Sequence, residues 1–286
     1  MSEDFLCRFM FEDLPVKGSL VRLSSSWQEI LARARPNSSA LSALGEAVCA
    51  SALLTSNIKF RGSVSLQIQS GGAIRLLMGQ CTHEGKLRGI ARMHAEKVAP
   101  LFEQAVLAIN LEQESGGAPY QGIVDIGAGG FVTALERYFS QSEQLETRFW
   151  LAADADQCGG LMLQKLPEQL PDPDDWNRLA HLASTISDTE LRNLSPERLI
   201  RVLFHEENVR LFSASDIGFG CSCSQQKVAG MLHWLGYDDL MELIEERGSV
   251  EVFCEFCGQE YQFDQVDVGR IFAANPMHLP DISGVH

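Results

Sequence analysis

Four of the eight cysteines of the chain stand in two close pairs in its last third. Cys221 and Cys223 form a Cys-x-Cys pair, and Cys254 and Cys257 form a Cys-x-x-Cys pair followed by Gly258. Two thiolates from each of two chain turns are what one tetrahedral Zn²⁺ requires. The glycine permits the tight turn of a zinc knuckle. We therefore predict that these four cysteines bind one Zn²⁺ per chain.

The spacing within the first pair is less usual, because most zinc-binding pairs have two to four residues between the ligands. A bound Zn²⁺ would hold all four sulfurs as thiolates, the form that reacts with oxidants. Each close pair could then close into its own disulfide and expel the metal. The site is expected to be stable while it is reduced and open to attack by an oxidant.

The segment that carries the four cysteines, residues 221–286, is small and acidic, with 11 acidic and 3 basic side chains and a net charge of −8. A domain of about 65 residues is marginally stable alone, because it buries only some 60% of its unfolded surface. Structural zinc contributes roughly 10–16 kcal/mol of apparent free energy in finger peptides, against about 5–15 kcal/mol for a whole typical domain. Loss of the metal should therefore unfold this segment.

The residues before 170 predict an α+β domain. Apolar and polar residues alternate in paired stretches that predict two β-hairpins, 63–70 with 73–79 and 106–113 with 119–127. A helix is predicted at 133–142 and a further strand at 147–156. Because hairpins dominate, we favour an antiparallel sheet packed with helices over a doubly wound parallel sheet.

A boundary is predicted at 166–176, which holds three prolines and four acidic residues. Beyond it, Ser195 and Pro196 are typical of a helix N-cap and a first helical position. The segment is polar and short of apolar residues, so its helices should be marginal unless they pack on a neighbour. The resulting division is 1–170 for the N-terminal α+β domain, 171–220 for a metastable helical linker and 221–286 for the C-terminal zinc-binding domain.

Within the last segment, helices are predicted at 225–236, 237–248 and 264–275, and a β-hairpin at 250–263, whose tip carries the second cysteine pair. The apolar residues Leu232, Trp234 and Leu235 are expected to lie in the core of this domain.

The composition of the whole chain excludes several partners. Its 286 residues carry a net charge of −15, which argues against nucleic acid, because phosphate backbones bind basic surfaces. The most apolar stretch, 40–54, is interrupted by Glu46 and falls short of the roughly 20 residues that a membrane span needs. The first residues carry acids where a secretory signal would carry positive charge. We therefore expect no membrane partner and a cytoplasmic location.

A reducing cytoplasm disfavours structural disulfides, so the eight cysteines are expected to be free thiols, metal ligands or thiols that oxidise only under stress. Cys7, Cys49, Cys81 and Cys158 have no partner close in sequence. We interpret these four as small buried or half-buried thiols.

The motifs taken together resemble the heat-shock protein 33 family of redox-regulated bacterial chaperones, and the resemblance runs nearly end to end. It rests on the Cys-x-Cys and Cys-x-x-Cys pairs and on the stretches SLQIQSGGAIRLLM (65–78), YQGIV (120–124), LERYFSQSEQLETRFWLA (135–152) and LFHEENVRLF (203–212). One departure is the stretch CSCSQQK (221–227), where the family commonly has charged residues soon after the first pair.

The resemblance implies a holdase that needs no ATP and binds unfolding client proteins under oxidative stress. Reduced members bind zinc through the four cysteines and are inactive. Oxidation forms disulfides, here Cys221–Cys223 and Cys254–Cys257, and releases the zinc. The C-terminal domain and the linker then unfold, and the active form is a homodimer. No catalytic residue is implied.

Two other functions are consistent with parts of the pattern. Cys254 and Cys257 could serve a thiol–disulfide oxidoreductase, although such motifs usually stand at a helix N-terminus and here both flanks predict strands. A zinc ribbon for nucleic acid is disfavoured by the net charge of −8 of its own segment.

Overall fold

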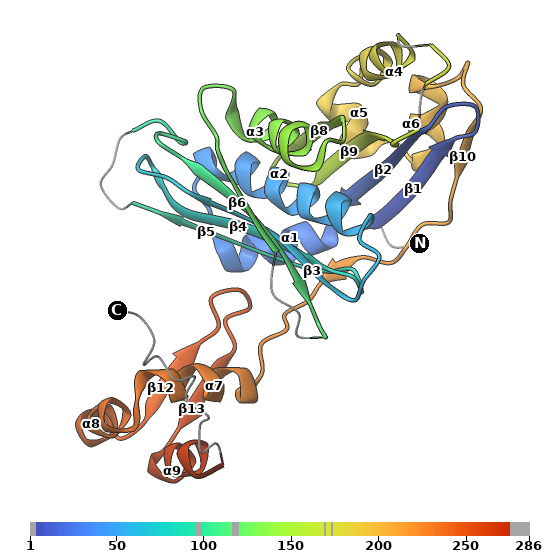
Figure 1. Ribbon diagram of the computed structural model, residues 1–286. Helices are drawn as coiled ribbons and strands as arrows, with labels where there is room; N and C mark the ends of the chain where they lie inside the picture. The colour runs from blue at the N-terminus through green and yellow to red at the C-terminus, as the bar shows by residue number, and fades with distance from the viewer. Residues whose placement is uncertain (1–3, 95–98, 116–119, 169, 173, 275–286) are drawn as a thin grey trace, which may run out of the picture. The chain divides into compact units, whose positions relative to one another are not determined.

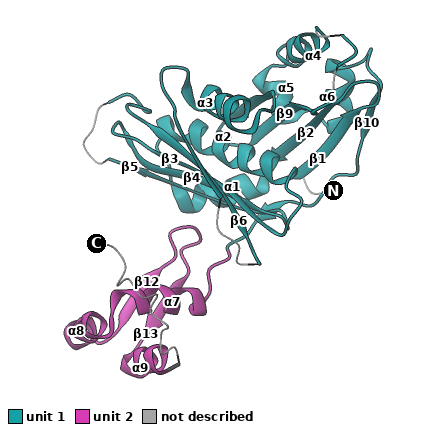
Figure 2. Ribbon diagram, viewed as in Figure 1, with its two compact units in different colours: residues 1–221 teal, residues 222–286 magenta. Residues whose placement is uncertain are grey.

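The computed structural model describes residues 4–94, 99–115, 120–168, 170–172 and 174–274. The chain forms two compact units, residues 1–221 and 222–286, shown in different colours in Figure 2. The proposed linker, 171–220, therefore packs with the N-terminal residues in unit 1. The architecture is mixed α+β with antiparallel sheets, as the hairpin patterns predict.

The first sheet of unit 1 has five antiparallel strands. Their order is β10 (Val209–Leu211), β1 (Phe5–Phe11), β2 (Val16–Leu23), β9 (Cys158–Lys165) and β8 (Thr147–Ala153). Strand β9 is buried on both faces, because Met162 belongs to one hydrophobic cluster and its neighbours Leu161 and Leu163 belong to another. The sheet thus separates two apolar layers.

The second sheet of unit 1 has six strands, in the order β11 (Gly218–Phe219), β5 (Lys86–Met93), β4 (Ile74–Thr82), β3 (Gly62–Gln69), β6 (Val106–Gln113) and β7 (Tyr120–Asp125). The hairpins predicted from alternating residues are confirmed as β3–β4 and β6–β7. All neighbours are antiparallel except β11, which runs parallel to β5. Strand β11 is therefore the outermost strand on that side.

Helices α1 (Ser25–Ala34), α2 (Ser38–Thr55) and α3 (Gly130–Tyr138) cover these sheets, and α3 continues into a π-helical turn, Phe139–Glu143. Helix α2 runs among the strands of both sheets in Figure 1, and most of its residues are buried. It can lie directly on β4 because Gly79 has no side chain. A Cβ at this position would come within 2.6 Å of the Ala47 carbonyl. Among the described residues α2 alone is long and apolar enough to span a membrane, but 72% of it is buried as a core helix.

The outer face of the five-stranded sheet is covered by α4 (Asp175–Ala183), α5 (Asp188–Asn193) and α6 (Pro196–Leu203). The predicted start of α6 is confirmed, since the Ser195 side chain accepts a hydrogen bond from the Arg198 backbone and Pro196 is the first helical residue. Their apolar side chains pack onto those of β1 in one cluster that includes Phe9 and Phe11. This packing supplies the neighbour that such polar, short helices need.

Unit 2 contains α7 (Gln225–Leu235), α8 (Tyr237–Arg247), the hairpin of β12 (Val250–Phe253) and β13 (Glu260–Phe263), and α9 (Gln265–Ala274). These elements are the ones predicted. Their buried core is small and consists of Val228, Leu232, Leu240, Ile244, Val250, Phe263 and Val268.

The prediction that Leu232, Trp234 and Leu235 all lie in this core is wrong for two of them. Leu232 is 3% exposed, whereas Trp234 is 78% and Leu235 57% exposed. Trp234 lies about 200° around the helix from Leu232 at 100° per residue, on the opposite side. Leu235 is the last residue of α7, directly before the turn at Gly236.

Asp4 ties the start of β1 to the start of α1. It is 4% exposed, and its carboxylate accepts hydrogen bonds from the backbone N–H groups of Ser24 and Ser26 and from the hydroxyls of Ser25 and Ser26. Burial alone would raise the pKa of Asp4, but the hydrogen bonds, of which that from Ser26 is the strongest, lower it overall.

We predict that Asp4→Asn lowers the free energy of unfolding of unit 1 by about 1–3 kcal/mol at pH 7. Because the pKa of Asp4 is lowered on folding, its stabilisation is present above the unfolded pKa and is lost as the pH falls through the folded pKa. The difference between wild type and variant should therefore shrink below about pH 4 in urea denaturation. The exposed Asp13→Asn is the matched control. A difference that stays constant with pH would contradict this role of the carboxylate.

Candidate metal centre

The first cysteine pair lies in a short connection between two regular elements. Cys221 and Cys223 stand between β11 and α7, and Ser224 caps α7 by accepting a hydrogen bond from the Lys227 backbone. Cys223 thus directly precedes a helix N-terminus, where the helix dipole favours a negatively charged sulfur.

The second cysteine pair lies at the tip of the β12–β13 hairpin, as predicted. The turn closes through hydrogen bonds from the Gly258 N–H to the Cys254 carbonyl, 2.8 Å, and from the Cys254 N–H to the Gln259 carbonyl, 2.9 Å. Gly258 has a φ of +73°, in the left-handed region that favours glycine. The predicted role of this glycine in the knuckle is confirmed.

The four sulfurs of Cys221, Cys223, Cys254 and Cys257 all lie within 4.8 Å of one another. The sulfurs of Cys223 and Cys257 are 3.4 Å apart. Four sulfurs placed about 2.3 Å from one tetrahedral ion lie about 3.8 Å from each other. The cluster is therefore close enough to bind one metal ion. It is the one group of three or more potential ligands of this kind among the described residues.

Two side chains that the sequence does not single out also touch the cluster. The Tyr261 hydroxyl donates a hydrogen bond to the Cys223 sulfur at 3.1 Å, and this bond, together with the negative charge of the cysteines, raises the pKa of Tyr261 to about 12. The Arg88 guanidinium donates to the Cys221 sulfur at 3.7 Å from strand β5. Both are donors that stabilise sulfur in its thiolate form. Their positions depend on strand register, which spacing alone does not reveal.

The other four cysteines differ from the cluster in burial. Cys7, Cys49, Cys81 and Cys158 are buried, whereas the cluster cysteines are half-buried. Burial raises the pKa of Cys7 to about 11 and that of Cys81 to about 12, and raises that of Cys158 well above the ordinary value. The thiols of Cys7, Cys81 and Cys158 therefore stay protonated near neutral pH and react slowly with oxidants. The burial of all four cysteines agrees with the interpretation from sequence.

Comparison with known proteins finds a matching family model and related sequences over most of the chain. The family model described as Hsp33 protein matches residues 4–264. A "33 kDa chaperonin" of Nitrosococcus oceani is 41% identical over 275 residues, covering 95% of each chain. Another from Methylobacillus flagellatus is 40% identical over 276 residues, covering 94% of each.

The fold also resembles a solved one. The crystal structure of the 33 kDa chaperonin (heat shock protein 33 homolog) from Thermotoga maritima aligns with a TM-score of 0.79 at 22% identity. The alignment covers 94% of this chain and 98% of that one. At this identity the likeness shows the α+β fold, and it extends across both units of the chain.

We predict that Tyr261→Phe weakens binding of Zn²⁺, used as the test ion, by about tenfold, because partners of metal ligands typically contribute 10–100-fold to affinity. The number of ions bound per chain should not change. Competition with a chromophoric chelator measures the affinity. Tyr237→Phe in the same unit, whose ring packs edge-on against Phe272, is the matched control. Equal affinities for the two variants would show that the Tyr261 hydroxyl does not support the site.

Proposed function

The chain belongs to the Hsp33 family of redox-regulated chaperones, which are not enzymes, and we propose that its four-cysteine cluster is the redox switch. In the reduced state the cluster binds one Zn²⁺ through Cys221, Cys223, Cys254 and Cys257. The family implies that the protein binds unfolded client proteins. In the proposed mechanism the Zn²⁺-bound protein is inactive and the oxidised protein holds clients without ATP.

One observation carries this proposal, namely that the thiols divide into two classes. Four lie together within 4.8 Å and are half-buried, and four are buried deep in unit 1. An all-sulfur tetrahedral site is the donor set that zinc prefers among common structural metals. A peroxide would therefore meet reactive thiolates only at the cluster.

The proposed reaction consumes two equivalents of peroxide. Each peroxide takes two electrons from a cysteine pair, its O–O bond breaks, an S–S bond forms, and two protons from solvent complete two molecules of water. Cys221 bonds to Cys223 and Cys254 bonds to Cys257. All four thiolates are consumed, so Zn²⁺ leaves with no remaining ligands. The short Cys223–Cys257 distance of 3.4 Å makes a disulfide across the pairs the main competitor.

Loss of the ion removes the largest stabilising contribution to unit 2. Between residues 222 and 274 its core holds seven buried residues, and zinc contributes roughly 10–16 kcal/mol in comparable small folds. We infer that unit 2 unfolds and that 171–220 then detaches as a metastable linker. Detachment would uncover the aromatic face of β1, including Phe9 and Phe11, which α4–α6 cover in the folded state. Such a surface offers unfolding clients an apolar contact.

Two further features belong to the same proposal. The active form is a homodimer, because the apolar surface that detachment of 171–220 uncovers favours self-association. The protein works in the cytoplasm, where a reducing environment keeps the eight cysteines from forming disulfides until an oxidant appears.

The alternative of a thiol–disulfide oxidoreductase is contradicted by the family, which is not an enzyme family. The local structure argues in the same direction. Cys254 and Cys257 lie at a hairpin tip between β12 and β13, whereas a low-pKa nucleophilic cysteine in such enzymes stands at a helix N-terminus.

We predict that peroxide at raised temperature releases one Zn²⁺ per chain and starts suppression of the aggregation of a thermally unfolding client. A colorimetric zinc chelator follows the release, light scattering follows the client, and sedimentation gives the oligomeric state. Mass spectrometry of the oxidised chain should find Cys221–Cys223 and Cys254–Cys257. A predominant Cys223–Cys257 bond would contradict the proposed pairing.

Substitution of the four cluster cysteines by serine should abolish both zinc binding and the response to peroxide. Cys81→Ala removes a buried thiol outside the cluster and is the matched control, which should respond like the wild type. A redox response that survives in the four-serine variant would refute the switch. A second refutation would be an oxidised wild-type protein that holds no client.

A further inference from the structure

The segment that joins the linker helices to the metal centre occupies the edge of the six-stranded sheet. We name residues 215–220 the strap. Ser215 forms a bridge with Leu6, and Gly218 and Phe219 then pair as β11 with Lys86 and Leu87 of β5. In Figure 1 the strap is part of the orange segment that follows β10. The next residue after it, Cys221, is the first cysteine of the cluster.

The strap is attached mainly through its backbone. The Gly218 N–H donates to the Gly85 carbonyl and the Gly220 N–H donates to the Leu87 carbonyl, both at 2.9 Å. The Phe219 N–H donates to the Ser26 hydroxyl at 3.0 Å, and that hydroxyl in turn donates to Asp4. Backbone bonds of this kind do not depend on the sequence of the bound strand.

Two apolar side chains complete the attachment. Ile217 is 6% exposed and belongs to the main core cluster of unit 1. Phe219 packs against the same cluster, and the Arg33 guanidinium of α1 lies 4.2 Å from the centre of its ring. The edge therefore accepts an aliphatic and an aromatic side chain two residues apart in an extended chain.

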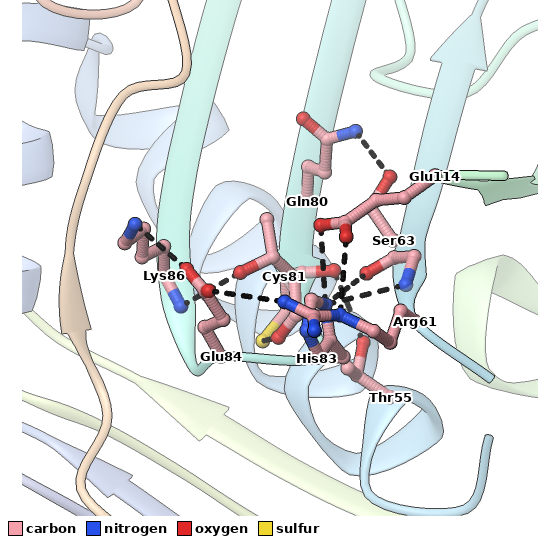
Figure 3. A network of polar contacts seen from close by, with 11 residues as sticks. Thr55, Arg61, Ser63, Gln80, Cys81, His83, Glu84, Lys86 and Glu114 are labelled. Carbon is pink, nitrogen blue, oxygen red and sulfur yellow. Dashed lines mark hydrogen bonds and ion pairs between the residues drawn. The ribbon is translucent and has the colours of Figure 1, made fainter. Parts of the chain in front are cut away.

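The receiving edge is held in place by contacts independent of the strap. Figure 3 shows the β4–β5 turn, where Glu84 pairs with Lys86 at 2.7 Å and Arg61 links Glu84 at 4.0 Å to Glu114 at 3.3 Å. Gly85 in this turn has a φ of +77°, and a Cβ there would come within 2.5 Å of the Asp216 carbonyl. The turn is thus shaped for the close approach of an extended backbone. The Arg61 pairs with Glu84 and Glu114, which do not involve Lys86, should hold it when the strap leaves.

We propose that the β5 edge is a client-binding site, which the strap occupies in the resting state and which an extended apolar segment of an unfolding protein occupies by strand addition after the strap leaves. This inference rests on the proposed function, because release of Cys221 from the metal frees the C-terminal end of the strap. The ligand is an extended chain with an aliphatic and an aromatic residue at alternate positions, as buried strands of other proteins supply when they unfold.

The opposite edge of the same sheet provides the comparison. Strand β7 ends the sheet on that side and carries exposed Tyr120 and Ile123 in the resting state. A site there would be open before and after oxidation. Of the two edges of this sheet, the β5 edge is the one that a described segment leading directly to Cys221 covers, so binding at β5 would depend on the redox state and binding at β7 would not.

The test places a photo-crosslinking amino acid at Lys86 on β5 or at Gln121 on β7 in the full-length chain. Both side chains are exposed. Each protein is illuminated with a thermally unfolding client before and after peroxide treatment, and aggregation of the client is followed in the same samples. We expect crosslinks at Lys86 only after oxidation, with crosslinking at Gln121 unchanged by oxidation.

A second variant tests whether the strap blocks the β5 edge. Phe219→Ala removes the ring that packs under Arg33 and should raise client holding and Lys86 crosslinking in the reduced, metal-loaded protein by roughly tenfold. Phe212→Ala is the matched control, because it makes the same change in the same connecting segment outside β11. Zinc content is measured in both variants to establish that the metal is retained.

The outcomes separate the two levels of the proposal. Client holding without crosslinks at Lys86, or equal behaviour of Phe219→Ala and Phe212→Ala, would overturn the β5 site and leave the switch standing. If the oxidised wild-type protein holds no client, the proposed function fails and the β5 site fails with it.

Discussion

In the proposed mechanism, the folded state of unit 2 depends on the bonds between one metal ion and the four clustered cysteines. Seven of its described residues form the buried core, and Trp234 and Leu235 remain exposed. Its acidic side chains repel one another, and four thiolates without a cation would add to that repulsion. A single divalent ion neutralises two of the four thiolate charges and joins the two chain turns at once. Stability and redox sensitivity therefore reside in the same four sulfur atoms.

Unit 1, in contrast to unit 2, is stabilised by large hydrophobic clusters. Helix α2 is buried among the strands of two sheets, and its core includes thiols whose burial keeps them protonated. The linker helices pack on one face of the five-stranded sheet. The strap, which leads from them to Cys221, is attached by backbone hydrogen bonds and by the side chains of Ile217 and Phe219. Oxidation is thus expected to affect the periphery of unit 1 and leave its core intact.

The sequence predicts most local structure because its signals are local. Alternation identifies the β3–β4 and β6–β7 hairpins, Ser195 with Pro196 identifies the start of α6, and the cysteine spacing identifies the cluster. Long-range contacts leave no comparable signal. The parallel pairing of β11 with β5, the Tyr261 hydrogen bond to Cys223 and the approach of Arg88 to Cys221 depend on how distant segments meet. Trp234 was misplaced because apolar character alone does not specify which helix face a small core can cover.

Hydrogen–deuterium exchange before and after removal of the metal tests the dependence of unit 2 on the cluster most directly. The protein is kept fully reduced and at neutral pH while a chelator removes the ion, so that no disulfide contributes. We predict that amides of α7, α8 and the β12–β13 hairpin lose protection while those of α2 keep it. Protection of α7 and α8 that is unchanged in the metal-free protein would contradict the dependence of this fold on the metal.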